Sequence, residues 1–170
     1  DYYEDDSLLI YVYDTKNCKE IIHYNIRMFD VDHSTTLVSL SADGKKLIAV
    51  GKEITICDFL TGKNSKTIIT DKDHNNPGLS LLDDFDPTAI ILSPSGKEIA
   101  MANQRDNKIY IYSFVTEKIL LTLKGHHDNV NSMEYDPNGK LLASTSKDKT
   151  VKLWDPKTGQ APLGVKVSLN

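Results

Sequence analysis

The sequence lacks the features that mark secreted or membrane-spanning proteins. Its 170 residues include only two cysteines, Cys18 and Cys57, whose separation fits neither a disulfide framework nor a metal-binding motif. It has no Asn-x-Ser/Thr acceptor site, and no apolar stretch approaches the roughly 20 residues that a membrane-spanning helix needs. These absences predict a soluble protein of a reducing, intracellular compartment with no membrane partner.

Signatures of catalysis and of cofactor binding are also scarce. The histidines, at positions 23, 33, 74, 126 and 127, have no spacing suited to zinc, and no glycine-rich phosphate loop is present. The only arginines are Arg27 and Arg105, and aromatic residues do not alternate with basic ones as in single-strand binders. The sequence therefore predicts no metal, no cofactor, no small-molecule substrate and no enzymatic activity.

Charge is distributed unevenly along the chain, whose net charge is -4 at pH 7. Residues 1–117 carry 12 Lys and Arg against 19 Asp and Glu, whereas residues 118–170 carry 8 Lys against 5 Asp and Glu. The acidic part disfavours a general nucleic-acid-binding surface. The basic part leaves two alternatives open, which are solvated strand edges and a local contact with phosphate groups.

The chain begins with an acidic run, Asp1–Asp6, that contains two tyrosines and has neither an initiator methionine nor an apolar signal segment. This beginning predicts a piece of a longer protein. The run itself fits a frayed terminus, with an acidic interaction tail as the alternative.

One unit recurs three times along the chain. It begins with a tight turn that ends in a glycine, at which a positive φ is expected, and continues with an apolar strand. The three glycines are Gly44, Gly96 and Gly139. A second strand with alternating apolar residues follows in each unit, and a fourth copy of it stands alone near the start. These strands end at Asp14, Asp58, Ser113 and Asp155, which are 44, 55 and 42 positions apart.

The longest of these intervals contains an insertion, residues 71–86, without which the period is close to that of β-propeller blades. No helical periodicity is sustained anywhere in the chain. We therefore predict an all-β propeller fragment of about three complete four-stranded blades, with partial strands at both ends. All 170 residues form part of one domain, with blades at about 19–58, 66–113 and 118–155, which amounts to about half a ring.

The third unit resembles a WD40 repeat. It combines a Gly-His pair, Gly125-His126, with Ser144 on its second strand, Asp148 in the next turn and a Trp-Asp pair that begins at Trp154. The resemblance implies that the side chains of His126, Ser144, Asp148 and Trp154 form one structural hydrogen-bond network. A buried indole N–H needs an acceptor, and a buried imidazole needs a partner that fixes its tautomer.

The other two units depart from this pattern. They have Cys57 and Tyr112 where the third unit has tryptophan, and a valine near positions 49–50 and Met101 where it has serine. Neither has a Gly-His pair. We expect apolar packing to hold these blades together.

Ser144, His126 and Asp148 also invite comparison with a hydrolase triad. No oxyanion-hole element or Gly-x-Ser-x-Gly turn accompanies them, and Ser144 lies in the middle of a predicted buried strand. The sequence favours a structural role over a catalytic one.

The order of units is most similar to that of the transducin-β-like WD-repeat subunits of the small-subunit processome, the particle that matures small ribosomal RNA. A strand without tryptophan, Gly51–Asp58, is followed by an acidic insertion, a second degenerate unit and then the first full Trp-Asp unit. This resemblance implies a non-catalytic scaffold in the nucleolus or nucleus that binds other protein subunits and contacts RNA indirectly or through its backbone. The alternative is a propeller that recognises a substrate or a modified peptide, such as a ubiquitin-ligase receptor, with a cytoplasmic location.

Two surface segments are further candidates for binding. One is a set of lysines that could contact phosphate or could simply keep strand edges soluble: Lys147, Lys149, Lys152 and Lys157. The other is an apolar set in the insertion that could form a docking loop or be disordered: Leu79, Leu81, Leu82 and Phe85. The insertion also contains Asp71-x-Asp73-x-Asn75, but it lacks the glycine and the final carboxylate of a calcium loop.

Overall fold

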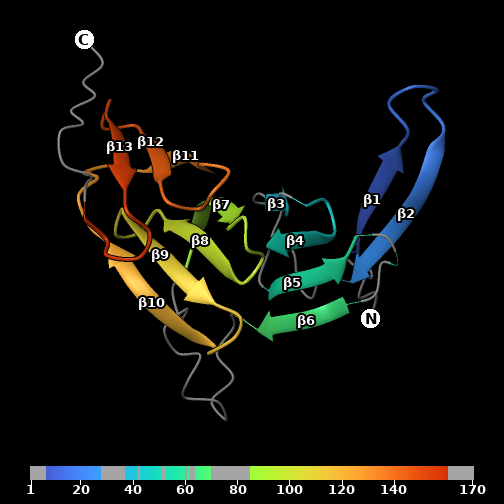
Figure 1. Ribbon diagram of the computed structural model, residues 1–170, viewed down its shortest axis with the longest axis horizontal. Helices are drawn as coiled ribbons and strands as arrows, with labels where there is room; N and C mark the ends of the chain where they lie inside the picture. The colour runs from blue at the N-terminus through green and yellow to red at the C-terminus, as the bar shows by residue number, and fades with distance from the viewer. Residues whose placement is uncertain are drawn as a thin grey trace, which may run out of the picture.

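The computed structural model describes residues 7–27, 37–41, 43–50, 53–59, 61, 64–69 and 85–160, and this part of the chain contains strands and no helix (Figure 1). It therefore has no helix that could cross a membrane. The strands are β1 (Ser7–Tyr13), β2 (Glu20–Arg27), β3 (Leu37–Leu40), β4 (Lys46–Val50), β5 (Glu53–Asp58), β6 (Asn64–Ile69), β7 (Pro87–Leu92), β8 (Glu98–Asn103), β9 (Lys108–Ser113), β10 (Lys118–Leu123), β11 (Val130–Tyr135), β12 (Leu142–Ser146) and β13 (Val151–Trp154).

The strands pair antiparallel in chain order. They form a first sheet (β3-β4-β5-β6), a middle sheet (β7-β8-β9-β10), a third sheet (β11-β12-β13) and a separate hairpin (β1-β2). The first strands of neighbouring sheets lie next to one another, β3 beside β7 and β7 beside β11. Figure 1 shows the three sheets following one another in an arc, with the β1–β2 hairpin beyond the first sheet. The predicted all-β propeller fragment is confirmed.

The sheets are offset by one strand from the units predicted from the sequence. The strands that open the predicted units 66–113 and 118–155 are β6 and β10, and they pair with β5 and β9 of the preceding sheet. Similarly, β2, which the unit 19–58 included, pairs with β1. A short turn places each of these strands directly beside its predecessor, so a hairpin is the nearest pairing. Residues 71–84 of the insertion and the segment 161–170 lie outside the described residues.

The glycine turns have the predicted geometry. Their φ values are +68°, +66° and +65° at Gly44, Gly96 and Gly139. In each turn the glycine N–H donates to the carbonyl three residues earlier, on Ser41, Ser93 or Asp136. The side chain of that earlier residue accepts the N–H that opens the following strand, as Asp136 does from Leu141 at 2.7 Å. The same turn therefore starts the second strand of every sheet.

The middle sheet is buried on both faces because it packs between its two neighbours. Along β8, Ile99 and Met101 point to the first sheet and pack with its isoleucines. The intervening Ala100 and Ala102 point to the third sheet and pack against Trp154. All four of these β8 side chains have 0% exposure. Because successive strand residues point to opposite faces, one strand presents bulky side chains to one neighbour and small ones to the other.

Candidate polar site in the third sheet

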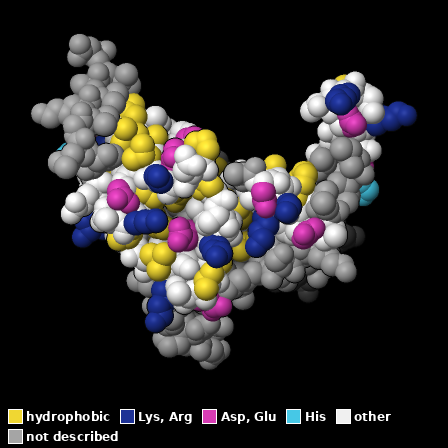
Figure 2. Space-filling view, viewed as in Figure 1, with side chains coloured by type: hydrophobic (Ala, Val, Ile, Leu, Met, Phe, Trp, Pro, Cys, Tyr) yellow, Lys and Arg dark blue, Asp and Glu magenta, His cyan; other side chains and the backbone are white. Residues whose placement is uncertain are grey.

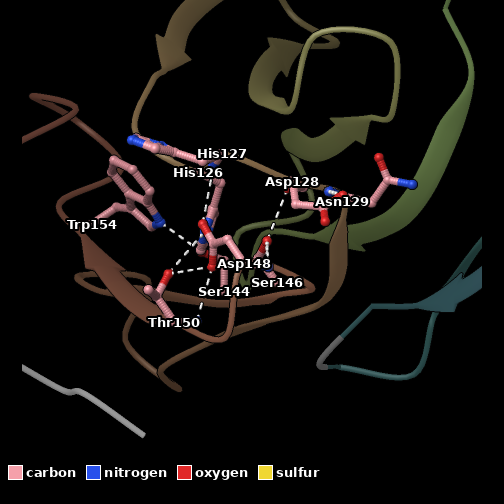
Figure 3. Close-up of polar contacts among 9 residues, drawn as sticks. All are labelled: His126, His127, Asp128, Asn129, Ser144, Ser146, Asp148, Thr150 and Trp154. Carbon is pink, nitrogen blue, oxygen red and sulfur yellow. Dashed lines mark hydrogen bonds and ion pairs between the residues drawn. The ribbon is translucent and has the colours of Figure 1, made fainter.

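The most polar part of the buried core lies in the third sheet (Figure 3). His126 comes from the connection between β10 and β11, Ser144 from β12, Asp148 and Thr150 from the β12–β13 turn, and Trp154 from the end of β13. The Trp154 Nε1–H donates to Ser144 Oγ at 2.8 Å. Ser144 Oγ lies 2.7 Å from His126 Nε2, and His126 Nδ1 lies 2.8 Å from Asp148 Oδ2. The structure thus joins the four residues that the repeat motif singled out.

The direction of the hydrogen bonds along this line follows from the groups at its two ends, the indole N–H of Trp154 and the carboxylate of Asp148. The indole N–H can only donate, so the hydroxyl of Ser144 accepts it and gives its own hydrogen to Nε2 of His126. An imidazole that accepts at Nε2 carries a proton on Nδ1, which it donates to the Asp148 carboxylate. Each polar atom along this line has a partner, which a buried network requires.

Asp148 is held ionised by several donors. Burial raises its pKa, but hydrogen bonds from Thr150, the His127 backbone and His126 outweigh burial and hold the pKa of this carboxyl well below its usual range. Thr150 donates through both Oγ1, at 2.6 Å, and its backbone N–H, at 2.9 Å. The carboxylate therefore fixes the imidazole from one side and the β12–β13 turn from the other.

The hydroxyl of Ser144 is inaccessible. Ser144 has 0% exposure, Trp154 has 5%, and the His126 side chain has 1%. A serine nucleophile must be reached by the carbonyl of its substrate. In this position Ser144 connects Trp154 to His126 inside the sheet and meets no substrate.

Gly125 makes room for this packing. A Cβ atom at Gly125 would lie 3.2 Å from Cη2 of Trp154, and the residue has φ +155°. Only glycine allows the backbone to pass this closely over the indole ring. The Gly-His pair therefore combines a close approach to Trp154 with the first hydrogen-bonding side chain of the network.

A second polar link was missed by the sequence reasoning. Ser146 Oγ donates to the carbonyl of Asp128 at 2.9 Å and accepts the N–H of Asp148 at 3.0 Å. It therefore ties the connection before β11 to the β12–β13 turn. The alternating spacing Ser146-x-Asp148-x-Thr150 is the signal that could have indicated it, since short polar side chains in turns commonly bond to nearby backbone.

Comparison with known proteins finds a family match over the segment that holds this network. Residues 117–155 match the family described as WD domain, G-beta repeat. This segment is therefore similar to a WD40 repeat. The matched residues hold every member of the network, and the sheets before them continue the same propeller fold.

Relatives match parts of the chain. The Periodic tryptophan protein 2 homolog of Schizosaccharomyces pombe is 40% identical over 68 residues, which are 40% of this chain and 8% of that protein. The Serine-threonine kinase receptor-associated protein of Gallus gallus is 33% identical over 90 residues, 51% of this chain and 26% of that protein. The WD repeat-containing protein 89 homolog of Dictyostelium discoideum is 39% identical over 90 residues, 52% of this chain and 25% of that protein. The chain thus spans about a quarter or less of these relatives.

The first and middle sheets fill the corresponding positions with other side chains. Pairing across the strands sets Leu142 opposite Trp154 and, equivalently, Leu47 opposite Cys57. Counting two residues on from Leu47 places Ala49 at the position of Ser144. The valine expected near positions 49–50 is therefore corrected to Ala49, since a one-residue change of register turns a side chain to the other face.

The middle sheet has a smaller polar cluster near its surface. Asp106, in the β8–β9 turn, accepts the hydroxyl of Tyr110 at 2.5 Å and lies 2.9 Å from Nζ of Lys108. Burial, together with the hydrogen bond to Asp106, raises the pKa of Tyr110 to about 12. This turn is equivalent to the one that holds Asp148, because Asn107 and Lys149, the residues after the two aspartates, both have a positive φ.

The structure does not gather the four candidate phosphate-binding lysines. Lys147 and Lys149 are exposed in the β12–β13 turn, whereas Lys157 follows the far end of β13, roughly 13 Å along the strand direction. Lys152 lies on β13 between them and is half-buried beside Gly125. Figure 2 shows Lys and Arg side chains interspersed with Asp and Glu on the visible face of the sheets.

Of the candidate docking-loop residues, the structure describes Phe85. Its half-buried ring packs against the core between the first and middle sheets, with the ring centroid 6.1 Å from that of Tyr110. Phe85 therefore contributes to the fold at the entry of β7. The remaining members, Leu79, Leu81 and Leu82, lie outside the described residues.

Proposed function

We propose that the chain is part of a non-catalytic WD40 scaffold that mediates protein–protein contacts in a large assembly. The observation that carries this proposal is that the potentially reactive side chains form hydrogen bonds with one another inside the fold. Ser144, His126 and Asp148 bond to one another, and the described residues contain no group of His, Cys, Asp and Glu suited to a metal ion. Such a protein binds its partners through the surface of its turns and strand edges.

The assembly we propose is the one that processes small-subunit ribosomal RNA, in the nucleolus. The support is the order of units along the chain, in which two degenerate units and an acidic insertion precede the complete WD40 repeat, as in the processome subunits that the sequence resembles. The basic segment 118–170 fits a location near RNA, with phosphate contacts that give affinity without sequence readout.

Affinity purification of the tagged full-length protein from its native cells tests this proposal. Mass spectrometry and RNA sequencing should recover processome subunits together with precursor ribosomal RNA. A double variant, Lys147→Glu with Lys149→Glu, should reduce the RNA yield while protein partners are retained. The matched control is Lys118→Glu with Lys124→Glu, which reverses two other exposed lysines of the same segment. Purification without ribosomal precursors would contradict the proposed assembly.

A recognition propeller is the second candidate. The similarity to the Serine-threonine kinase receptor-associated protein favours it, because that relative's name describes association with a receptor. Under this candidate the same purification would recover a signalling receptor, ligase subunits or modified peptides in place of precursor ribosomal RNA. Reversing the charges of Lys147 and Lys149 would then leave any background yield of RNA unchanged.

A further inference from the structure

The glycine turns before the second strand of each sheet differ in their acidic residues. Each turn begins at the residue whose carbonyl accepts the glycine N–H. In the first sheet the third residue of the turn is Asp43, and in the third sheet the first residue is Asp136. Both carboxylates accept a backbone N–H of their turn, from Lys45 at 3.0 Å and from Lys140 at 2.6 Å. The turn of the middle sheet, residues 93–98, has serine at both positions and so has no carboxylate at either.

Ser95 is the third residue of the middle-sheet turn and is equivalent to Asp43. The Asp43 carboxylate accepts the hydroxyl of Ser41 at 2.6 Å as well as the backbone N–H two residues later. Ser95 Oγ lies 2.9 Å from Ser93 Oγ and accepts the N–H of Lys97 at 3.3 Å. The two partners are therefore of the same kind in both turns. A hydroxyl oxygen is one bond closer to the backbone than a carboxylate oxygen, which accounts for its longer distance to the amide.

The donors at this position favour a negative charge. Hydrogen bonds from the Ser41 hydroxyl and the Lys45 backbone lower the pKa of the Asp43 carboxyl below its usual value. The middle-sheet turn directs the same kinds of donor at Ser95, and the adjacent Lys97 is exposed. The next acid in the sequence, Glu98, lies two residues before Ala100 on the face of β8 that packs against the third sheet. An anionic group on Ser95 would therefore meet donors that already bind an anion in the first sheet.

Ser95 is accessible to an enzyme. It is exposed, whereas Ser93 in the same turn is only 4% exposed. The side-chain hydrogen bonds that close this turn are also long. Ser93 Oγ accepts the N–H of Glu98 at 3.2 Å, compared with 2.7 Å for the equivalent bond from Leu141 to Asp136. The middle-sheet turn should therefore open at a lower free-energy cost than the turn of the third sheet.

We propose that Ser95 is a phosphorylation site, and that its phosphate supplies the anion that Asp43 supplies in the first sheet. A protein kinase transfers the γ-phosphoryl group of ATP to Ser95 Oγ. A bond forms between Oγ and phosphorus, the bond from this phosphorus to the bridging oxygen of ATP breaks, the hydroxyl proton passes to a base of the kinase, and ADP leaves.

The phosphate has the length and charge that the turn requires. Its terminal oxygens lie two bonds beyond Oγ, so they reach further toward the Lys97 N–H than the hydroxyl does, and they also accept the hydroxyl of Ser93. A phosphoserine carries a charge of about -1.5 to -2 at pH 7, and its hydrogen bonds are stronger than those of a neutral hydroxyl. Phosphorylation of Ser95 thus fixes the turn and makes this end of the middle sheet negative, which changes the surface that a partner meets.

Mass spectrometry of the tagged full-length protein, purified from its native cells with phosphatase inhibitors, tests whether Ser95 is modified. Trypsin releases residues 73–97 as one peptide, and fragment ions should place a phosphate on Ser95 and none on the buried Ser93. Ser95→Ala should abolish the phosphate on this peptide, whereas the matched control Ser95→Thr should retain it. A peptide without phosphate, or with phosphate only at another residue, would overturn the proposal.

Hydrogen exchange of the same full-length protein, before and after phosphatase treatment, tests the role of the phosphate. The Lys97 amide should exchange more slowly in the phosphorylated protein by roughly threefold or more, because its hydrogen bond becomes charge-assisted. Ser95→Asp should slow this amide in the dephosphorylated protein as well. The Lys140 amide of the third-sheet turn is the control and should not change. Equal exchange of the Lys97 amide in the two states would contradict the assigned contact.

Discussion

The third sheet and the first sheet share an antiparallel strand order and a glycine turn before the second strand, but their interiors differ. In the third sheet a line of hydrogen bonds runs from Trp154 through Ser144 and His126 to Asp148. In the first sheet the equivalents of Trp154 and Ser144 are Cys57 and Ala49, with 1% and 0% exposure. The first sheet therefore forms without the line of hydrogen bonds from a tryptophan through a serine. The polar network adds directional contacts that fix one arrangement of the loop before β11 relative to the β12–β13 turn.

The difference has an energetic consequence. An apolar interior tolerates exchanges between apolar side chains of similar volume, which usually cost less than about 1.5 kcal/mol. A buried hydrogen-bonded line is less tolerant, since removal of one member leaves its neighbours without partners at a cost of roughly 1–3 kcal/mol for each group. Substitutions at equivalent positions of the two sheets should therefore have unequal effects.

The largest difference is expected at the end of the line. Trp154→Ala should lower the free energy of unfolding by about 3–5 kcal/mol, because it opens a large cavity and removes the donor to Ser144. The matched variant Cys57→Ala in the first sheet removes one sulfur atom and should cost about 1 kcal/mol. Denaturant titration with fluorescence and circular dichroism measures both. Equal decreases in the free energy of unfolding would show that Trp154 stabilises the third sheet no more than Cys57 stabilises the first.

A smaller effect is expected from an exchange between Ser144 and its equivalent. Ser144→Ala should cost about 2–3 kcal/mol, because the Trp154 N–H and His126 Nε2 both lose their partner. The reciprocal change, Ala49→Ser, should destabilise the first sheet by about 1–3 kcal/mol, since its new hydroxyl is buried at a position with 0% exposure. Hydrogen exchange of the β4 and β12 amides localises each loss. Stabilisation by Ala49→Ser would contradict the assignment of Ala49 to the apolar interior.

The polar network should also make the third sheet sensitive to acid. Asp148→Asn removes charge-assisted hydrogen bonds and should cost about 1.5–3 kcal/mol at pH 7. Because the pKa of Asp148 is lower in the folded state than the roughly 3.9 of an unfolded aspartate, its stabilisation is present above that value and is lost as pH falls below it.

The difference in unfolding free energy between the wild-type and Asp148→Asn chains should therefore shrink between pH 5 and pH 2. This difference is the informative quantity, because Asp136 and Asp155 also have lowered pKa values, due first to hydrogen bonds from the backbone of Leu141 and Lys157 respectively, and they weaken both chains alike. A difference that stays constant with pH would show that the carboxylate charge of Asp148 does not contribute.

Most of the fold and the members of the hydrogen-bonded line could be predicted from the sequence, because turn, strand and Trp-Asp signals recur at a regular period. The period gives the length of a repeat but does not show at which strand each sheet begins. For that reason β6 and β10 were assigned to the following unit. Register escaped prediction at Ala49, since neighbouring apolar residues differ only in the face to which they point. The four lysines of residues 147–157 are close in the sequence, whereas β13 separates Lys157 from Lys147 and Lys149, and their contact with phosphate stays a prediction.

The smallest effect is expected at a buried hydroxyl outside the line. Tyr135 on β11 is 7% exposed, and its hydroxyl has no hydrogen-bond partner among the described residues. Burial, with a further contribution from the charge of Glu98, raises the pKa of Tyr135, so its hydroxyl stays protonated and still needs an acceptor. Tyr135→Phe keeps the ring in the core and removes this group, so stability should stay unchanged or rise by up to about 1 kcal/mol. Thermal unfolding of the two chains measures the change, with Ser144→Ala as the contrasting loss of a satisfied hydroxyl. A decrease after Tyr135→Phe would mean that this hydroxyl also has a partner, and the third sheet would then depend on polar contacts on β11 as well as along β12 and β13.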